Sequence, residues 1–121
     1  MDKLFVYGIF LSEYARRDYH MGNPEYAVVE DYTTILMMPG SDIVAAIPLK
    51  GVALTGLLVD IPAVYLDPDR KGEEITWLDN WERLDQLEAG YDRIKVETVI
   101  GEEAYMYVMK NKSNKSNKSR K

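Results

Sequence analysis

A carboxylate on an apolar helix face is the feature of this sequence with the clearest chemical meaning. Residues Thr76–Glu88 have the pattern of an amphipathic helix, with Trp77, Trp81 and Leu84 at the spacing of one face. Glu88 continues that face, because at about 100° per residue it projects within about 20° of Trp77. Apolar surroundings raise the pKa of a carboxyl group, which suits general acid/base catalysis near neutral pH.

A structural interpretation of Glu88 stands beside the catalytic one. Gly90 is typical of a residue that ends a helix, so Glu88 belongs to the last turn. If that turn opens, the carboxylate lies in water as an ordinary surface group. If it stays closed, the carbonyl end of the helix dipole raises the pKa of Glu88 further. Asp85, on the same helix, is expected to fix a nearby loop.

The composition excludes several kinds of catalytic site. The chain has no cysteine, so it has neither disulfides nor thiolate nucleophiles and metal ligands. His20 is its only histidine and lies in a polar stretch typical of a surface loop, which excludes the common histidine-based zinc sites. The 20 acidic residues show no calcium-loop spacing. A metal held by carboxylates alone stays open, although these carboxylates are scattered through turns.

Charge divides the chain into two parts. The last twelve residues, 110–121, carry six of the 15 basic side chains and no acid, and they contain three Asn-Lys-Ser triplets. The remaining 109 residues have nine basic and 20 acidic side chains, a net charge of −11. We interpret residues 1–109 as one domain and 110–121 as a disordered basic tail, which either keeps the protein in solution or makes a weak nucleic-acid contact. An acidic domain argues against nucleic acid as the main partner.

No stretch of the sequence has the length of a membrane span, and the N-terminus enters a strand-like run without a signal-peptide core. Together with the lack of cysteine, this predicts a cytoplasmic protein with no membrane partner.

Short apolar runs predict six or seven strands and one main helix. The strand-like segments are Leu4–Tyr7, Glu25–Glu30, Thr33–Met38, Ile43–Leu49, Val52–Ile61, Tyr91–Val99 and Ala104–Met109. Lys50-Gly51 suggests a hairpin between the fourth and fifth segments, and Gly56 suggests a bulge or a close backbone approach. Residues 9–24 have the pattern of a loop with one short helical turn. The fold class is thus α+β, with a small antiparallel or mixed sheet that curls towards a β-barrel.

Four segments, in order, resemble the γ-glutamylcyclotransferase-like family. Val6–Phe10 resembles its Tyr-Gly-Ser-Leu loop, and Val52–Leu58 is similar to its central strand. Leu84–Tyr91 resembles its Leu-Asp-x-x-Glu-Gly segment with the tyrosine that follows, and Ala104–Val108 is similar to its last strand. The resemblance implies a small mixed β-barrel with a pocket at one mouth.

The same resemblance implies an activity and a site. Members of this family convert γ-glutamyl amines or γ-glutamyl amino acids to 5-oxoproline and release the amine, without a metal or cofactor. Carried over to this sequence, Glu88 is the acid/base. The backbone of Tyr7, Gly8, Ile9 and Phe10 forms the pocket rim, and Tyr91 lines the pocket. The implied partner is a small-molecule γ-glutamyl substrate.

Three interpretations of function remain open at this stage. The sequence departs from the family where Ile9 and Phe10 replace a small polar residue and Leu, and where Ala89 replaces the glycine after the glutamate. A bulky Phe10 that fills the pocket would favour a non-catalytic ligand-binding or interaction module. Glu88 on the apolar face favours a cyclotransferase, and a related amide-cleaving enzyme could use the same residue.

Overall fold

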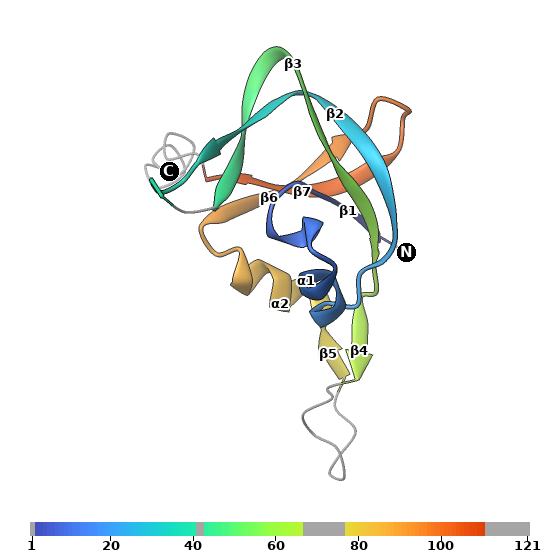
Figure 1. Ribbon diagram of the computed structural model, residues 1–121. Helices are drawn as coiled ribbons and strands as arrows, with labels where there is room; N and C mark the ends of the chain where they lie inside the picture. Colours follow the sequence, from blue (N-terminus) through green and yellow to red (C-terminus); the bar gives the residue numbers. More distant parts are fainter. Residues whose placement is uncertain (1, 41–42, 67–76, 111–121) are drawn as a thin grey trace, which may run out of the picture.

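The computed structural model describes residues 2–40, 43–66 and 77–110 (Figure 1). Five strands form the main sheet: β1 (Asp2–Val6), β2 (Gly22–Leu36), β3 (Val44–Ile61), β6 (Tyr91–Glu97) and β7 (Glu103–Met109). Their order is β2-β3-β1-β7-β6. The sheet is mixed, because β1 runs parallel to β7 while β1–β3, β2–β3 and β6–β7 are antiparallel.

The remaining elements lie outside this sheet. A short 3-10 helix, η1 (Ile9–Leu11), leads into α1 (Glu13–Asp18), and β4 (Val64–Leu66) pairs with β5 (Trp77–Asp79) ahead of α2 (Asn80–Leu87). Both α-helices lie on the same side of the curved main sheet, near the β4–β5 pair (Figure 1). The predicted α+β class and mixed sheet are confirmed. The sheet curls as expected, but its edge strands β2 and β6 do not pair with each other, so it is open rather than a closed barrel.

The prediction of four short strands between residues 25 and 61 is wrong. β2 and β3 are two long strands that pair along most of their length and bend together midway. Asp31 and Gly51 have φ values of 67° and 91° at the bend, and the Gly51 amide donates a hydrogen bond to Asp31 Oδ1 at 2.9 Å. Because both strands turn at the same place, pairing resumes beyond the bend and no hairpin forms at Lys50-Gly51. Residues 9–24 are more helical than predicted, since they contain both η1 and α1.

The main helix also begins later than predicted. Thr76 lies outside the described residues, and Trp77 belongs to β5 instead of the helix. Asp79 is the N-cap, because its Oδ1 accepts hydrogen bonds from the amides of Trp81 and Glu82 at 3.0 and 3.3 Å. Trp81 and Leu84 are buried as the spacing predicts.

Two apolar clusters form the core on opposite faces of β1. Leu4 and Val6 pack with Trp81 and Leu84 of α2, whereas Phe5 packs with residues of β2, β3 and β7. This follows from the alternation of side chains along a strand. The core therefore fixes α2 directly to β1. Within the described part of the chain, no helix is long and apolar enough to cross a membrane. The predicted tail, apart from Lys110, lies outside that part.

Candidate active site

A cavity of about 410 Å³ opens where β1 ends and the chain enters η1. It brings together all six residues that the sequence nominated: Tyr7, Gly8, Ile9, Phe10, Glu88 and Tyr91. The described residues that also line it are Leu4, Phe5, Val6, Ser12, Ile43, Val44 and Tyr107. Cavities of this size hold small-molecule ligands.

Glu88 is fixed in the cavity wall by its backbone. As the C-cap of α2, it donates its amide hydrogen to the Leu84 carbonyl at 2.9 Å, and its own carbonyl accepts from the Tyr91 amide at 2.9 Å. The last turn therefore stays closed, and the side chain is half-buried. Among the described residues, none forms a hydrogen bond or ion pair with the Glu88 carboxylate. Burial raises the pKa of Glu88 above its ordinary value.

Tyr7 ties three strands together at the floor of the site. Its hydroxyl donates to the carbonyl of Tyr107 on β7 and accepts from the amide of Ala46 on β3, the latter at 2.9 Å. Burial raises the pKa of Tyr7 well above that of a free tyrosine, and the charge of Glu88 adds to this effect. Tyr7 is consequently a neutral hydroxyl whose hydrogen bonds are structural.

Tyr91, which also lines the cavity, makes a similar bond to a backbone carbonyl. Its hydroxyl donates to the Val44 carbonyl at 2.8 Å, which connects β6 to the first residue of β3. Burial raises the pKa of Tyr91, and so does the negative charge of Glu88. The negative charge of Glu88 thus acts on both tyrosines. Each hydroxyl nevertheless donates its hydrogen bond to a backbone carbonyl.

Gly8, Ile9 and Phe10 all line the cavity, but Phe10 does not fill it. Phe10 is only 5% exposed and packs edge-on against Tyr19, with ring centroids 5.5 Å apart. Ile9, in contrast, is 67% exposed. Arg16 holds the turn in place, because its Nη1 donates to the carbonyls of Phe10 and Leu11 at 2.9 and 2.8 Å. Phe10 therefore does not block the cavity in the way that the interpretation of a non-catalytic module required.

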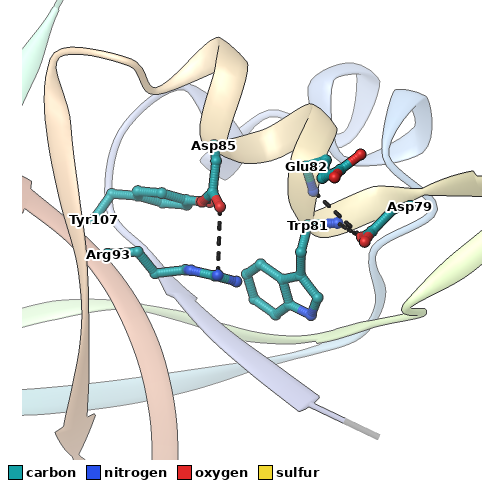
Figure 2. Close-up of polar contacts among 6 residues, drawn as sticks. All are labelled: Asp79, Trp81, Glu82, Asp85, Arg93 and Tyr107. Atoms are coloured by element: carbon teal, nitrogen blue, oxygen red, sulfur yellow. Dashed lines mark hydrogen bonds and ion pairs between the residues drawn. The ribbon is translucent and has the colours of Figure 1, made fainter.

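A polar cluster joins α2 to the sheet one helical turn before Glu88. Asp85 accepts a hydrogen bond from the Tyr107 hydroxyl at 2.7 Å and pairs with Arg93 at 3.3 Å (Figure 2). The Arg93 guanidinium in turn lies 4.5 Å from the centre of the Trp81 ring. The expectation that Asp85 would fix a nearby loop was wrong, since its partners lie on β7 and β6. Sequence spacing gave no signal for Tyr107.

We predict that the Asp85–Tyr107 hydrogen bond contributes measurably to stability. Asp85→Ala and Tyr107→Phe should each lower the free energy of unfolding, and a double-mutant cycle should give a coupling of about 1 kcal/mol. Denaturant unfolding of the wild type, both single variants and the double variant measures this value. Tyr26→Phe, at an exposed position, is the control and should change stability by less than about 0.5 kcal/mol. Strict additivity of the two changes would contradict the coupling.

No cation site accompanies these residues. Within the described residues, no group of three or more histidine, cysteine or acidic side chains could hold a metal ion. The arrangement supplies a half-buried carboxylate, apolar walls and backbone amides at the Gly8–Phe10 segment.

Solved structures share this fold, although no family model and no curated protein matches the sequence. The solution structure of an Arabidopsis thaliana protein covers 92% of this chain and 70% of its own, with 18% identity and a TM-score of 0.66. An uncharacterized protein from Pyrococcus horikoshii covers 90% of this chain and 78% of its own, with 17% identity and a TM-score of 0.61. A third structure, named gamma-glutamyl cyclotransferase, covers 91% of this chain and 67% of its own, with 15% identity and a TM-score of 0.58.

This chain has the γ-glutamyl cyclotransferase fold. The resemblance seen in the sequence is confirmed at that level. At 15% identity, the likeness to the γ-glutamyl cyclotransferase structure shows only that the two backbones follow the same course. What the protein does depends on the side chains that this chain brings to the cavity.

Proposed function

We propose that this protein is a γ-glutamyl cyclotransferase-type enzyme, which converts a γ-glutamyl amine or γ-glutamyl amino acid to 5-oxoproline and releases the amine. The observation that carries the proposal is a half-buried Glu88 without a charged or hydrogen-bonding partner among the described residues, in the wall of a cavity of about 410 Å³. The shared fold supports the same reaction class. A cytoplasmic location remains part of the proposal.

The reaction needs a base because the substrate supplies its own nucleophile. The α-amino group of a γ-glutamyl compound is protonated near neutral pH and cannot attack until a proton is removed. In the proposed mechanism Glu88 takes that proton, and the amino nitrogen attacks the γ-carbonyl carbon to close a five-membered ring. The bond to the leaving nitrogen then breaks as Glu88 returns a proton to it, and the second proton that the ring nitrogen loses also passes to the released amine, which leaves as an ammonium ion. Water is not consumed.

The cavity would contribute by holding the substrate bent. Ring closure within one bound molecule gains a large effective molarity once the two reacting atoms are held together. The amides at the start of η1 lack acceptors within that helix, so the Gly8–Phe10 rim can bind the α-carboxylate or the developing oxyanion. In this proposal Tyr7 and Tyr91 shape the cavity walls and do not transfer protons, because each hydroxyl already donates a hydrogen bond to a backbone carbonyl.

We predict that activity falls at acidic pH through the ionisation of Glu88. Burial raises its pKa above the ordinary value of 4.5, and only the ionised form can accept a proton. The acid limb of kcat/KM against pH should therefore have its midpoint above 4.5. An acid limb at or below 4.5 would contradict a buried carboxylate as the base.

The direct test is release of 5-oxoproline from a panel of γ-glutamyl amides and dipeptides. Turnover that requires Glu88 would support both the reaction and the residue. Binding of panel members without turnover would instead favour a non-catalytic ligand-binding module on the same fold.

A further inference from the structure

Only one of the described side chains that line the cavity is charged. Glu88 is that side chain, and the others are apolar residues, three tyrosines, Gly8 and Ser12. No Lys, Arg or His is among the described lining residues. A bound molecule therefore meets a single negative charge and otherwise uncharged walls.

Three cations of the adjoining elements already have partners, and none of the three is among the described lining residues. Arg16 donates to the carbonyls of Phe10 and Leu11, which lie in the η1 turn. Arg93 pairs with Asp85, and Lys110 Nζ donates to the Ala89 carbonyl at 3.2 Å. Arg93 and Lys110 line a separate, more open hollow on the other side of Tyr91. A carboxylate inside the cavity would find no positive side chain among these.

This distribution of charge should make the cavity discriminate between γ-glutamyl amines and γ-glutamyl amino acids. Both kinds carry one α-carboxylate on the glutamyl part, which the backbone amides of the rim can bind. A γ-glutamyl amino acid carries a second carboxylate on its leaving group. That group would lose its hydration beside Glu88 without gaining a cation, which is costly for an ionised carboxylate. An amine without a carboxylate avoids this penalty.

The mouth of the cavity is apolar as well as uncharged. Ile9 and Ile43 line it and are 67% and 54% exposed. The apolar surface continues into the β2–β3 turn, where the Met37 amide donates to the Ile43 carbonyl at 2.9 Å and Met38 is exposed. An alkyl or aryl leaving group could cover these side chains and remove their apolar area from water.

We propose that the leaving group of the substrate is an uncharged, apolar amine, so that the enzyme prefers γ-glutamyl amides of such amines to γ-glutamyl amino acids. This inference rests on the proposed function and narrows its substrate class. The recognition would come from apolar contact at Ile9 and Ile43 and from rejection of a second carboxylate.

A matched pair of substrates tests this preference. γ-Glutamyl-leucine and the γ-glutamyl amide of 3-methylbutylamine differ only in the leaving-group carboxylate. We expect kcat/KM for the amide to be at least tenfold higher. Across linear alkylamides, kcat/KM should rise by up to about fourfold for each methylene that becomes buried. Equal values for the matched pair, or a higher value for γ-glutamyl-leucine, would overturn the proposal.

Variants of Ile9 test whether the lack of a cation at the cavity mouth causes the preference for the amide. Ile9→Lys adds a cation at an exposed position and should reduce the preference for the amide by about tenfold, whereas Ile9→Gln is the uncharged control and should preserve it. If Lys110→Met changes the preference and Ile9→Lys does not, the discrimination comes from the neighbouring hollow and the proposed mouth is wrong.

Failure of the proposed function would be distinguishable from failure of this inference. If neither member of the pair yields 5-oxoproline, the proposed reaction fails. Calorimetric binding of the same pair to the wild-type protein then measures the preference without turnover. Tighter binding of the amide supports rejection of the second carboxylate, and equal or tighter binding of γ-glutamyl-leucine overturns it.

Discussion

Glu88→Gln is expected to abolish 5-oxoproline release and to leave the protein folded. Glutamine has nearly the same shape as glutamate but cannot accept a proton, so removal of the base should cost at least about 100-fold in kcat. Rates on a γ-glutamyl amide, with wild type and variant at equal concentration, measure the effect. Retained turnover would exclude Glu88 as the acid/base.

The same variant should also be at least as stable as the wild type at neutral pH. Burial disfavours the ionised form of Glu88, so its folded-state pKa lies above the unfolded value. The folded state then binds more protons between those two pKa values, and this group lowers stability as pH rises from about 4.5 through the folded pKa. An uncharged glutamine removes that loss. Thermal unfolding at neutral pH should give the variant an equal or higher Tm.

Tyr91→Phe is the matched comparison within the site. The Tyr91 hydroxyl donates to the Val44 carbonyl, so we expect its loss to weaken turnover much less than the loss of the Glu88 carboxylate. An equal or larger effect would mean that the tyrosine moves the proton instead. The two variants together separate acid/base chemistry from the shape of the cavity wall.

Gly56→Ala is expected to destabilise the protein strongly. A Cβ at this position would lie 2.2 Å from the Val6 carbonyl oxygen and 2.8 Å from Cζ of Phe5. Val6 pairs with Leu57 of β3, so its backbone has little freedom to retreat. We expect a loss of about 3 kcal/mol, or a Tm lower by roughly 10 °C, at the upper end of what overpacking costs.

Gly22→Ala supplies the control for Gly56. Gly22 also lies in a strand of the main sheet, but no atom comes within 4 Å of the position its Cβ would take. We expect this change to leave the free energy of unfolding within about 1 kcal/mol of the wild type. Denaturant unfolding of both variants measures the comparison. Similar losses in the two would show that the contact with Val6 is not the cause.

Close contact at Gly56 also connects stability to the site. Val6 and Phe5 line the cavity, so a displaced β1 would alter its floor. A destabilised Gly56→Ala protein should therefore lose activity even below its unfolding transition. This loss would differ from that of Glu88→Gln, which leaves stability intact.

Of the six candidate site residues, only Glu88 was nominated from a local pattern, by its place after Leu84 on an apolar helix face. The others were nominated through the family resemblance. Gly56, outside that set, stood out as a glycine within an apolar run. Such patterns reflect the regular spacing of side chains along a helix or a strand, and residues close together in the chain determine that spacing. The strands β1, β6 and β7 were predicted within a few residues for the same reason. The N-terminal limit of α2 was not, because pairing of β5 with β4 takes Trp77 out of the helix.

By itself, the sequence determined the α+β class, a sheet that curls and a carboxylate at the end of an apolar helix face. It left the sheet antiparallel or mixed. Only the tertiary structure decided that β2 and β3 are continuous, since their bend depends on a bond between Asp31 and Gly51 from different strands. The tertiary structure also brought Tyr107 and Val44 to the cavity and directed Phe10 into the core. These contacts join residues far apart in the chain, and no local periodicity specifies which distant surfaces meet.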